Sequence, residues 1–180
     1  SSAASDVYKR QNLNKAIQTV QRAISSKPST PIFSGIHLIA DNNILEIQAM
    51  DLNMAIACSI EAEIQEKGEI VVSAKHFSEL MRKLPGENVT IVKNKEEKTI
   101  NVQSDKSDFQ LLLMNEDDYP KFPEFNADKQ IVLEDEKIKE LIKKTIFACS
   151  TDEARPLFTG ILVELQDLSL IHISEPTRRT

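Results

Sequence analysis

The sequence predicts an α+β fold in which helices cover one face of an antiparallel sheet. Two observations support this fold class. Segments with apolar residues at helical spacing alternate with short strand-like segments, and the order of helix, strands, helix and strands begins again in the last third of the chain. The chain has 180 residues, of which 41% are hydrophobic, so it can bury a substantial core and does not have the composition of a disordered protein.

Two helices are predicted in the first half of the chain. Leu13, Ile17 and Val20 recur at helical spacing within 12–26, and a proline-containing segment ends this helix. The second helix is predicted over 74–84, with the residue at its start, Ser73, as N-cap and a Pro-Gly pair after its end.

Alternating or continuous apolar runs predict the strands between and after these helices. They lie at 32–40, 44–50, 54–64, 70–73, 89–93, 99–103 and 108–114, with turns predicted at Asp41-Asn42-Asn43 and at Asp51. The segment Asn115–Asp128 has two prolines and five acids and is predicted to be a solvated linker.

An internal repeat indicates a duplicated domain. Residues 15–40 align without gaps with residues 140–165 at an offset of 125, with seven identities in 26 positions. Both copies contain a helix, then the pattern P-[IL]-F-[ST]-G-I, then a strand. An offset of 125 residues is too long for a solenoid repeat, so we expect two domains, the second of which stops after about a third of its length.

Both ends of the chain are expected to be non-native. The strings SSAASDVYKRQ at 1–11 and LSLIHISEPTRRT at 168–180 resemble translated transposase-type sequencing adapters. The predicted organisation is therefore a first domain at 12–128 that lacks its opening strand and the start of a second domain at 129–167, with a longer protein continuing beyond. The repeat places the missing strand at 6–8, and the alternation of Asp6–Lys9 could fill this slot.

Charge is distributed unevenly between helices and strands. Without the two end segments, 18 basic and 26 acidic residues remain, a formal charge of −8. Residues 12–40 nevertheless have a charge of +3 and the helix at 74–84 has +2, whereas residues 41–73 have −6. Basic residues are spaced seven apart on each predicted helix, as Lys15 and Arg22 illustrate, and therefore share one helix side. Such a surface could bind the phosphates of a nucleic acid. The alternative is that these residues are ordinary solvated lysines and arginines, which are common on helices.

Composition argues against several other classes of protein. The two cysteines, Cys58 and Cys149, lie far apart and have no ligand at zinc spacing, which favours a reduced cytosolic protein without a disulfide framework or metal site. His76 has no second ligand at metal spacing. Four glycines are too few for a Gly-rich phosphate-loop enzyme, and no apolar run is long enough to span a bilayer. No cofactor is expected.

An ordered set of five segments resembles one known family. They are AIQTVQRAISSKPSTPIFSGI, MDLNMAI, SAKHFSELMRKLP, MNEDDYPKFPE and FACSTDEARPLFTGILVE. Together they resemble the bacterial DNA polymerase III beta subunit, the sliding clamp. The resemblance implies a DNA clamp fold with helices lining the hole of a ring and sheets outside. It also implies a non-catalytic processivity factor that encircles duplex DNA as a homodimer and tethers the replicative polymerase, the clamp loader and other proteins with clamp-binding motifs in the cytoplasm.

The resemblance also implies roles for individual residues. It suggests DNA contacts for seven basic residues: Lys27, Arg155, Arg22, Lys75, Arg82, Lys143 and Lys144. Phe158 matches the rim of the partner-peptide pocket, although core packing is the alternative for this residue. His76, Lys106 and Phe109 match the face that closes the ring. For Arg155, an ion pair with Asp152 or Glu153 is the alternative role.

Two other functions remain open from the sequence. An enzyme could use Glu116, Asp117 and Asp118 as a metal or acid–base cluster. A protein-interaction scaffold that does not bind DNA is the second alternative. Retention on circular DNA would separate a clamp from a scaffold, and metal-dependent activity would reveal an enzyme.

Overall fold

The computed structural model describes residues 6–94, 96–123, 132–152, 154–166 and 169–174. The chain divides into two compact units, residues 1–124 and residues 125–180. Among the described residues, no helix is both long and apolar enough to cross a membrane. The first unit contains most of the described regular structure.

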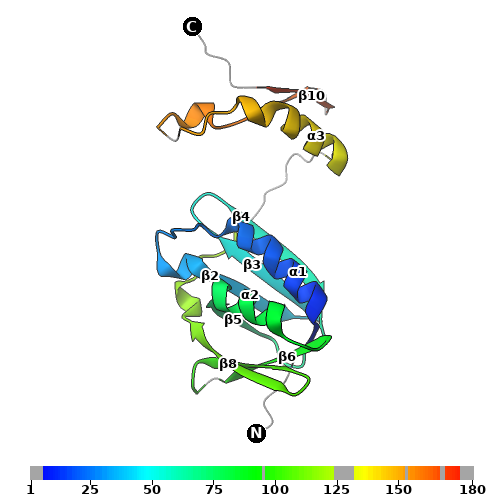
Figure 1. Ribbon diagram of the computed structural model, residues 1–180, viewed down its shortest axis with the longest axis vertical. Helices are drawn as coiled ribbons and strands as arrows, with labels where there is room; N and C mark the ends of the chain where they lie inside the picture. The colour runs from blue at the N-terminus through cyan, green and yellow to red at the C-terminus, as the bar shows by residue number, and fades with distance from the viewer. Residues whose placement is uncertain (1–5, 95, 124–131, 153, 167–168, 175–180) are drawn as a thin grey trace. The chain divides into compact units, whose positions relative to one another are not determined.

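The first unit is one antiparallel sheet with two helices on the same face (Figure 1). Its helices and 3₁₀ turns are α1 (Arg10–Val20), η1 (Gln21–Ala23), η2 (Pro31–Ser34), α2 (Ala74–Lys83) and η3 (Glu116–Asp118). Its strands are β1 (Asp6–Lys9), β2 (Gly35–Asp41), β3 (Ile44–Met50), β4 (Ala55–Glu61), β5 (Gly68–Ser73), β6 (Asn88–Asn94), β7 (Thr99–Ser104) and β8 (Ser107–Met114). The strand order is β1-β6-β7-β8-β5-β2-β3-β4, which confirms the predicted antiparallel α+β class.

The helices bury their apolar sides against the sheet. Leu13 and Ile17 of α1 and Phe77 and Met81 of α2 are fully buried, as the helical spacing predicted. Each such side chain contributes roughly 1.5–3 kcal/mol by leaving water. Alternate residues of the strands complete this main core, so the sheet face under the helices is apolar.

A second apolar cluster lies on the opposite face of the sheet. Val71 belongs to this cluster, whereas its neighbours in β5 belong to the main core, as alternation along a strand requires. The cluster consists of Ile32, Phe33, Met50, Val71 and Tyr119, and we call it the outer cluster. Tyr119 comes from the segment predicted to be a solvated linker, so that prediction is wrong for this residue. A large aromatic ring gains more by entering an apolar site than by staying in water.

The ends of several elements differ from the sequence prediction. The first helix begins at Arg10 instead of residue 12 and tightens into η1 at Gln21, because the Ile24 N–H bonds the Gln21 carbonyl. Ser73 precedes α2 as predicted, but its side chain makes no capping hydrogen bond. The turn at 41–43 is confirmed, with positive φ values of 48° at Asn42 and 60° at Asn43, which asparagine tolerates well.

The strand slot that the repeat predicts at 6–8 is filled. Residues of β1 pair with β6 in antiparallel register, from Asp6 opposite Ile91 to Lys9 opposite Asn88. The segment that resembles an adapter therefore completes this edge of the sheet.

The second unit contains one helix and one hairpin. Its elements are α3 (Asp135–Thr145), η4 (Ile146–Ala148), η5 (Pro156–Phe158), β9 (Leu162–Gln166) and β10 (Ser169–Ser174). The tail at 168–180 was expected to lie outside the fold, but Ser169–Ser174 pairs with β9. The hairpin begins with Gln166 opposite Ser169, which matches Asp41 opposite Ile44 in the first unit, and then shifts register between Leu170 and His172.

The second unit lacks the partners that close the first. Ile17 of α1 is fully buried, whereas its repeat equivalent Ile142 in α3 is 38% exposed. Gly35 is enclosed, since an added Cβ would lie 2.8 Å from the Val71 Cγ1 and 3.0 Å from the Met114 Sδ. The equivalent Gly160 has nothing within 4 Å of such a Cβ. The repeat is therefore complete in sequence up to β9 and incomplete in packing.

We predict different effects of alanine at three glycines. Gly35→Ala should destabilise the first unit by about 1–3 kcal/mol, because the methyl group would overlap Val71 and the Ile32 carbonyl. Gly68→Ala and Gly160→Ala should be neutral or slightly stabilising, since both positions are open. Urea unfolding of the three variants measures these differences. An equal loss for Gly160→Ala and Gly35→Ala would contradict the open packing of the second unit.

A second prediction concerns the stability of the first unit in alkali. Burial raises the pKa of Tyr119 to about 12 from its ordinary value of 10.0. The folded state therefore favours the protonated phenol, and this contribution to the free energy of unfolding is complete below pH 10 and lost as the pH rises towards 12. Between about pH 8 and about pH 11, urea unfolding should show a larger loss of stability for the parent chain than for Tyr119→Phe. Identical losses would contradict the buried phenol.

Candidate nucleic-acid interface

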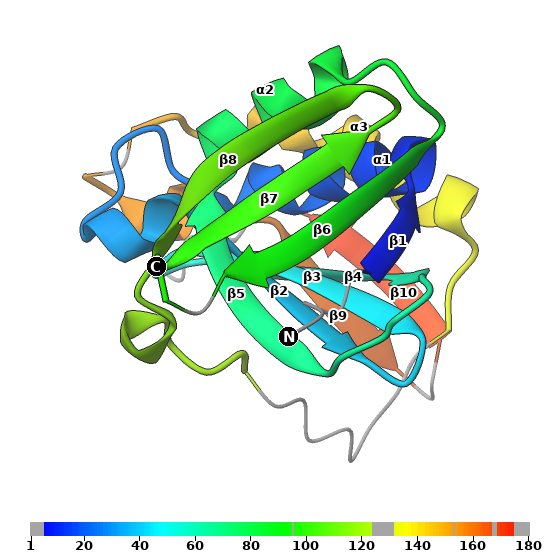
Figure 2. The ribbon, with the colours of Figure 1, turned by 90° about the horizontal axis from the view of Figure 1, so that it is seen from below.

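The two helices of the first unit lie side by side on the sheet (Figure 1 and Figure 2), and two hydrogen bonds show that they run in opposite directions. The Gln21 Nε2 donates to the Ala74 carbonyl at 3.1 Å, which joins the end of α1 to the start of α2. The Arg10 Nε donates to the Gly86 carbonyl at 2.6 Å, which joins the start of α1 to the segment after α2. The helices thus form one layer with a common outer surface.

The outer surface of this layer is basic. Lys15 on α1, Arg22 on η1, and Lys75 and Arg82 on α2 are exposed, whereas the opposite side of each helix is apolar. None of these four side chains forms an ion pair within the part of the chain that the structure describes. The only acidic residue on either helix is Glu79. The cations therefore point to solvent without intramolecular neutralisation.

Lys27 extends the basic surface past the end of α1. It lies in the loop after η1, its side chain is exposed, and its backbone N–H donates to the Ser25 Oγ at 3.2 Å. This hydrogen bond holds the backbone of the loop, while the ammonium remains free of ion pairs among the described residues. Sequence analysis did not single out Lys83, which is exposed in the last turn of α2, where a cation also interacts favourably with the helix dipole.

The predicted basic residues of the second unit are exposed as well. Lys143 and Lys144 lie in the last turn of α3, and the Lys144 Nζ lies 2.7 Å from the Glu140 Oε1. The hydrogen bond from Lys144 lowers the pKa of Glu140. Arg155 lies in a turn closed by its N–H and the Asp152 carbonyl at 3.2 Å.

The guanidinium of Arg155 makes no ion pair with Asp152 in the described part of the chain, which removes one of its two alternative partners. The other alternative partner, Glu153, lies outside the described residues.

Phe158 has a different environment from its repeat equivalent. Phe33 is buried in the outer cluster, whereas Phe158 in η5 is only half-buried. The Phe158 carbonyl accepts from the Ser150 N–H at 2.8 Å, so the backbone of this turn is fixed. The side chain is therefore accessible in the second unit as described.

Two of the three residues predicted to close a ring lie on or next to β8, and the third lies on α2. Within the described residues, β8 pairs with β7 at residues 107–112 and with β5 only at Leu113 and Met114, so residues 107–112 have one unpaired side. Phe109 lies in this segment and is 41% exposed, and Lys106 is exposed in the turn before β8. His76 is exposed in the first turn of α2. Sequence analysis did not foresee the unpaired edge, because strand patterns do not reveal which strands pair.

The acidic cluster at Glu116–Asp118 is solvated at two of its three residues, as the sequence predicted, and differs at the first. Glu116 is half-buried, and its Oε2 lies 2.9 Å from the Lys93 Nζ. Asp117 and Asp118 are exposed. In the described residues, no group of three or more His, Cys, Asp or Glu side chains could hold a metal ion.

Comparisons with known proteins agree with this geometry. A family model described as "DNA polymerase III beta subunit, N-terminal domain" matches residues 7–123. The beta sliding clamp of Bacillus subtilis is 30% identical over 178 residues, covering 94% of this chain and 47% of the relative. The beta sliding clamp of Halalkalibacterium halodurans is 32% identical over 165 residues, covering 87% and 42% respectively.

Solved structures give the same result. The crystal structure of the DNA polymerase sliding clamp from Bacillus subtilis matches with a TM-score of 0.84 and 30% identity, covering 89% of this chain and 44% of the other. The beta subunit from the DNA polymerase of Streptococcus pyogenes matches with a TM-score of 0.84 and 27% identity, covering 91% and 44%. The chain spans a little under half the length of the relatives it matches. It belongs to the DNA polymerase III beta subunit family, the bacterial sliding clamps.

Proposed function

We propose that the chain is part of a ring-shaped sliding clamp that encircles duplex DNA and acts as a processivity factor for the replicative polymerase. The observation that carries this proposal is the orientation of charge in the first unit. An acidic chain directs unpaired cations to the outer surface of two neighbouring helices, which is where a phosphate backbone could be contacted. The names of its relatives support the same function.

The proposed contact with DNA is electrostatic and independent of base sequence. Long, exposed lysine and arginine side chains can reach phosphates without entering a groove, and each contact releases counterions. Such a surface holds DNA loosely and permits sliding. The clamp would act by its topology and would make or break no covalent bond.

We assign the DNA contacts to seven of the exposed cations of the two units. They are Arg22, Lys27, Lys75, Arg82, Lys143, Lys144 and Arg155. Lys144 is the weakest candidate, because its ammonium already bonds Glu140. Lys27 and Arg155 are the strongest, because both lie in loops and form no ion pair among the described residues.

The proposed ring requires contacts with other domains and a second chain. The proposed dimer face is the unpaired edge of β8, on which Phe109 is exposed. It includes Lys106 in the turn before β8 and His76 on α2. An unpaired strand edge can accept a strand from a partner. Phe158 is the proposed contact for clamp-binding peptides of the polymerase, the clamp loader and other partners, acting in the bacterial cytoplasm.

We propose domain limits of 12–128 and 129–167, with both flanking segments non-native. The division of the chain into two compact units at residues 124 and 125 lies close to the proposed boundary. The open packing around Gly160 and Ile142 is what a truncated second domain would show.

The test of this function is a titration of the chain with a short DNA duplex. We predict weak, sequence-independent binding at low salt, with a logarithmic affinity that falls linearly with the logarithm of the salt concentration. Arg22→Gln with Lys75→Gln should lower the affinity roughly three- to tenfold and reduce the salt slope by about two, since two phosphate contacts are lost. Fluorescence anisotropy at several salt concentrations measures both quantities.

The matched control removes two positive charges from segments that connect strands. Lys67→Gln with Lys98→Gln changes two exposed lysines of strand-connecting turns and should leave the salt slope unchanged. If both double variants reduce DNA affinity equally, net charge governs the association. The basic surface of α1 and α2 would then have no specific role in DNA binding. If the parent chain binds no DNA at low salt, the scaffold alternative is favoured.

A further inference from the structure

The eight-stranded sheet consists of two halves that are joined at a narrow place. One half contains β1, β6, β7 and β8, and the other contains β5, β2, β3 and β4. The two halves are paired only by Val71 opposite Met114 and Val72 opposite Leu113. Other pairs of neighbouring strands share between four and seven register positions. Backbone pairing between the halves is therefore short, and the main core under the helices joins them on one face only.

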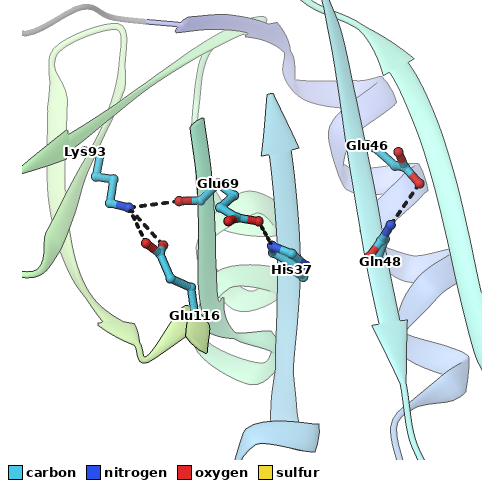
Figure 3. Close-up of polar contacts among 6 residues, drawn as sticks. All are labelled: His37, Glu46, Gln48, Glu69, Lys93 and Glu116. Carbon is cyan, nitrogen blue, oxygen red and sulfur yellow. Dashed lines mark hydrogen bonds and ion pairs between the residues drawn. The ribbon is translucent and has the colours of Figure 1, made fainter. Parts of the chain in front are cut away.

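Lys93 crosses this junction with its side chain. It lies near the end of β6 and pairs with Ile100 of β7, which places its backbone in the first half. Its ammonium donates to the Glu69 carbonyl of β5, in the other half, at 2.9 Å (Figure 3). The two residues belong to strands that are not neighbours in the sheet, so this hydrogen bond links the halves independently of β8.

The same ammonium also holds the segment that leaves the sheet. It lies 2.9 Å from the Glu116 Oε2 and 3.2 Å from the Glu116 Oε1 (Figure 3). Glu116 begins η3, two residues after the end of β8. The Lys93 and Glu116 side chains are 31% and 35% exposed, so the pair is better shielded from solvent than a surface ion pair. The ammonium has three donor hydrogens, and its acceptors lie on β5 and on η3.

A second anchor lies three residues further along. Tyr119 is buried in the outer cluster, and its ring centroid lies 5.1 Å from that of His37. The His37 Nε2 lies 2.9 Å from the Glu69 Oε2, so Glu69 receives Lys93 on its carbonyl and His37 on its carboxylate. The segment after β8 is therefore fixed to the sheet by an ion pair at Glu116 and by an apolar contact at Tyr119.

We propose that Lys93 is a positioning residue whose ammonium clasps the two half-sheets and the segment after β8 together. The clasp fixes the angle of β8 relative to β5 and fixes the point at which the chain leaves the first unit. Glu116 is the acidic partner of Lys93. The buried ring of Tyr119 holds η3 against the sheet by its apolar contacts. This device depends on the geometry of the first unit and not on any ligand.

The test is hydrogen exchange at the amides of Asp118 and Tyr119. These N–H groups donate to the Asn115 and Glu116 carbonyls at 3.3 and 3.1 Å and exchange when η3 opens. Lys93→Met and Glu116→Gln should each lower the protection of both amides roughly three- to tenfold. Protection of Ile17 and Val20 in α1, which lies in the main core, should change much less. The double variant should lose no more protection than the stronger single variant, because both substitutions break the same ion pair between Lys93 and Glu116.

Two substitutions serve as matched controls. Asp117→Asn removes an exposed acid of the same turn, and Lys98→Met removes an exposed lysine between β6 and β7. Both should leave the protection of Asp118 and Tyr119 unchanged. The proposal is overturned if Lys93→Met leaves the protection of these amides unchanged or lowers protection equally throughout the first unit. It is also overturned if the two single effects add in the double variant. A loss of protection in the control variants as large as in the test variants would overturn it as well.

Discussion

The burial of α1 and α2 on one face of the sheet is the interaction on which the other features depend. Ile17 and Phe77 are fully buried between helix and sheet, so each helix has only one orientation that keeps its apolar side dry. Arg22 and Lys75 lie on the opposite sides of these helices and must face solvent. The same hydrophobic packing that stabilises the domain therefore organises its charge. A net acidic chain can present a basic surface because its acids are concentrated in strands and loops.

The second unit shows what happens when this packing is incomplete. It repeats the helix and the following strand of the first unit, and the structure gives both elements where the repeat predicts them. Ile142 and Gly160 nevertheless remain accessible, because the described residues of this unit do not cover them as fully as Ile17 and Gly35 are covered in the first unit. Local sequence thus determines the secondary structure, whereas burial requires the rest of the domain.

Much of the fold and of the basic surface could be predicted from the sequence, because both depend on local periodicity. Helical spacing predicted α1 and α2 with their buried and exposed sides, and turn residues such as Asn42 and Asn43 predicted a hairpin. Contacts between distant residues could not be predicted in this way. Lys93 is 23 residues from Glu116, and nothing in either neighbourhood indicates their ion pair. For the same reason, Glu116 and Tyr119 were assigned to a solvated linker, and the unpaired edge of β8 was missed.

We propose that this family member holds DNA by topology, with non-specific phosphate contacts that permit sliding. The most direct measurement uses a protein in which this chain is completed to the length of its relatives and loaded onto nicked circular DNA. We predict that the protein stays on the circular DNA at a salt concentration that abolishes binding to a short duplex. Cutting the circle should release the protein. Equal loss from circular and cut DNA would contradict a closed ring, as would retention on the cut molecule.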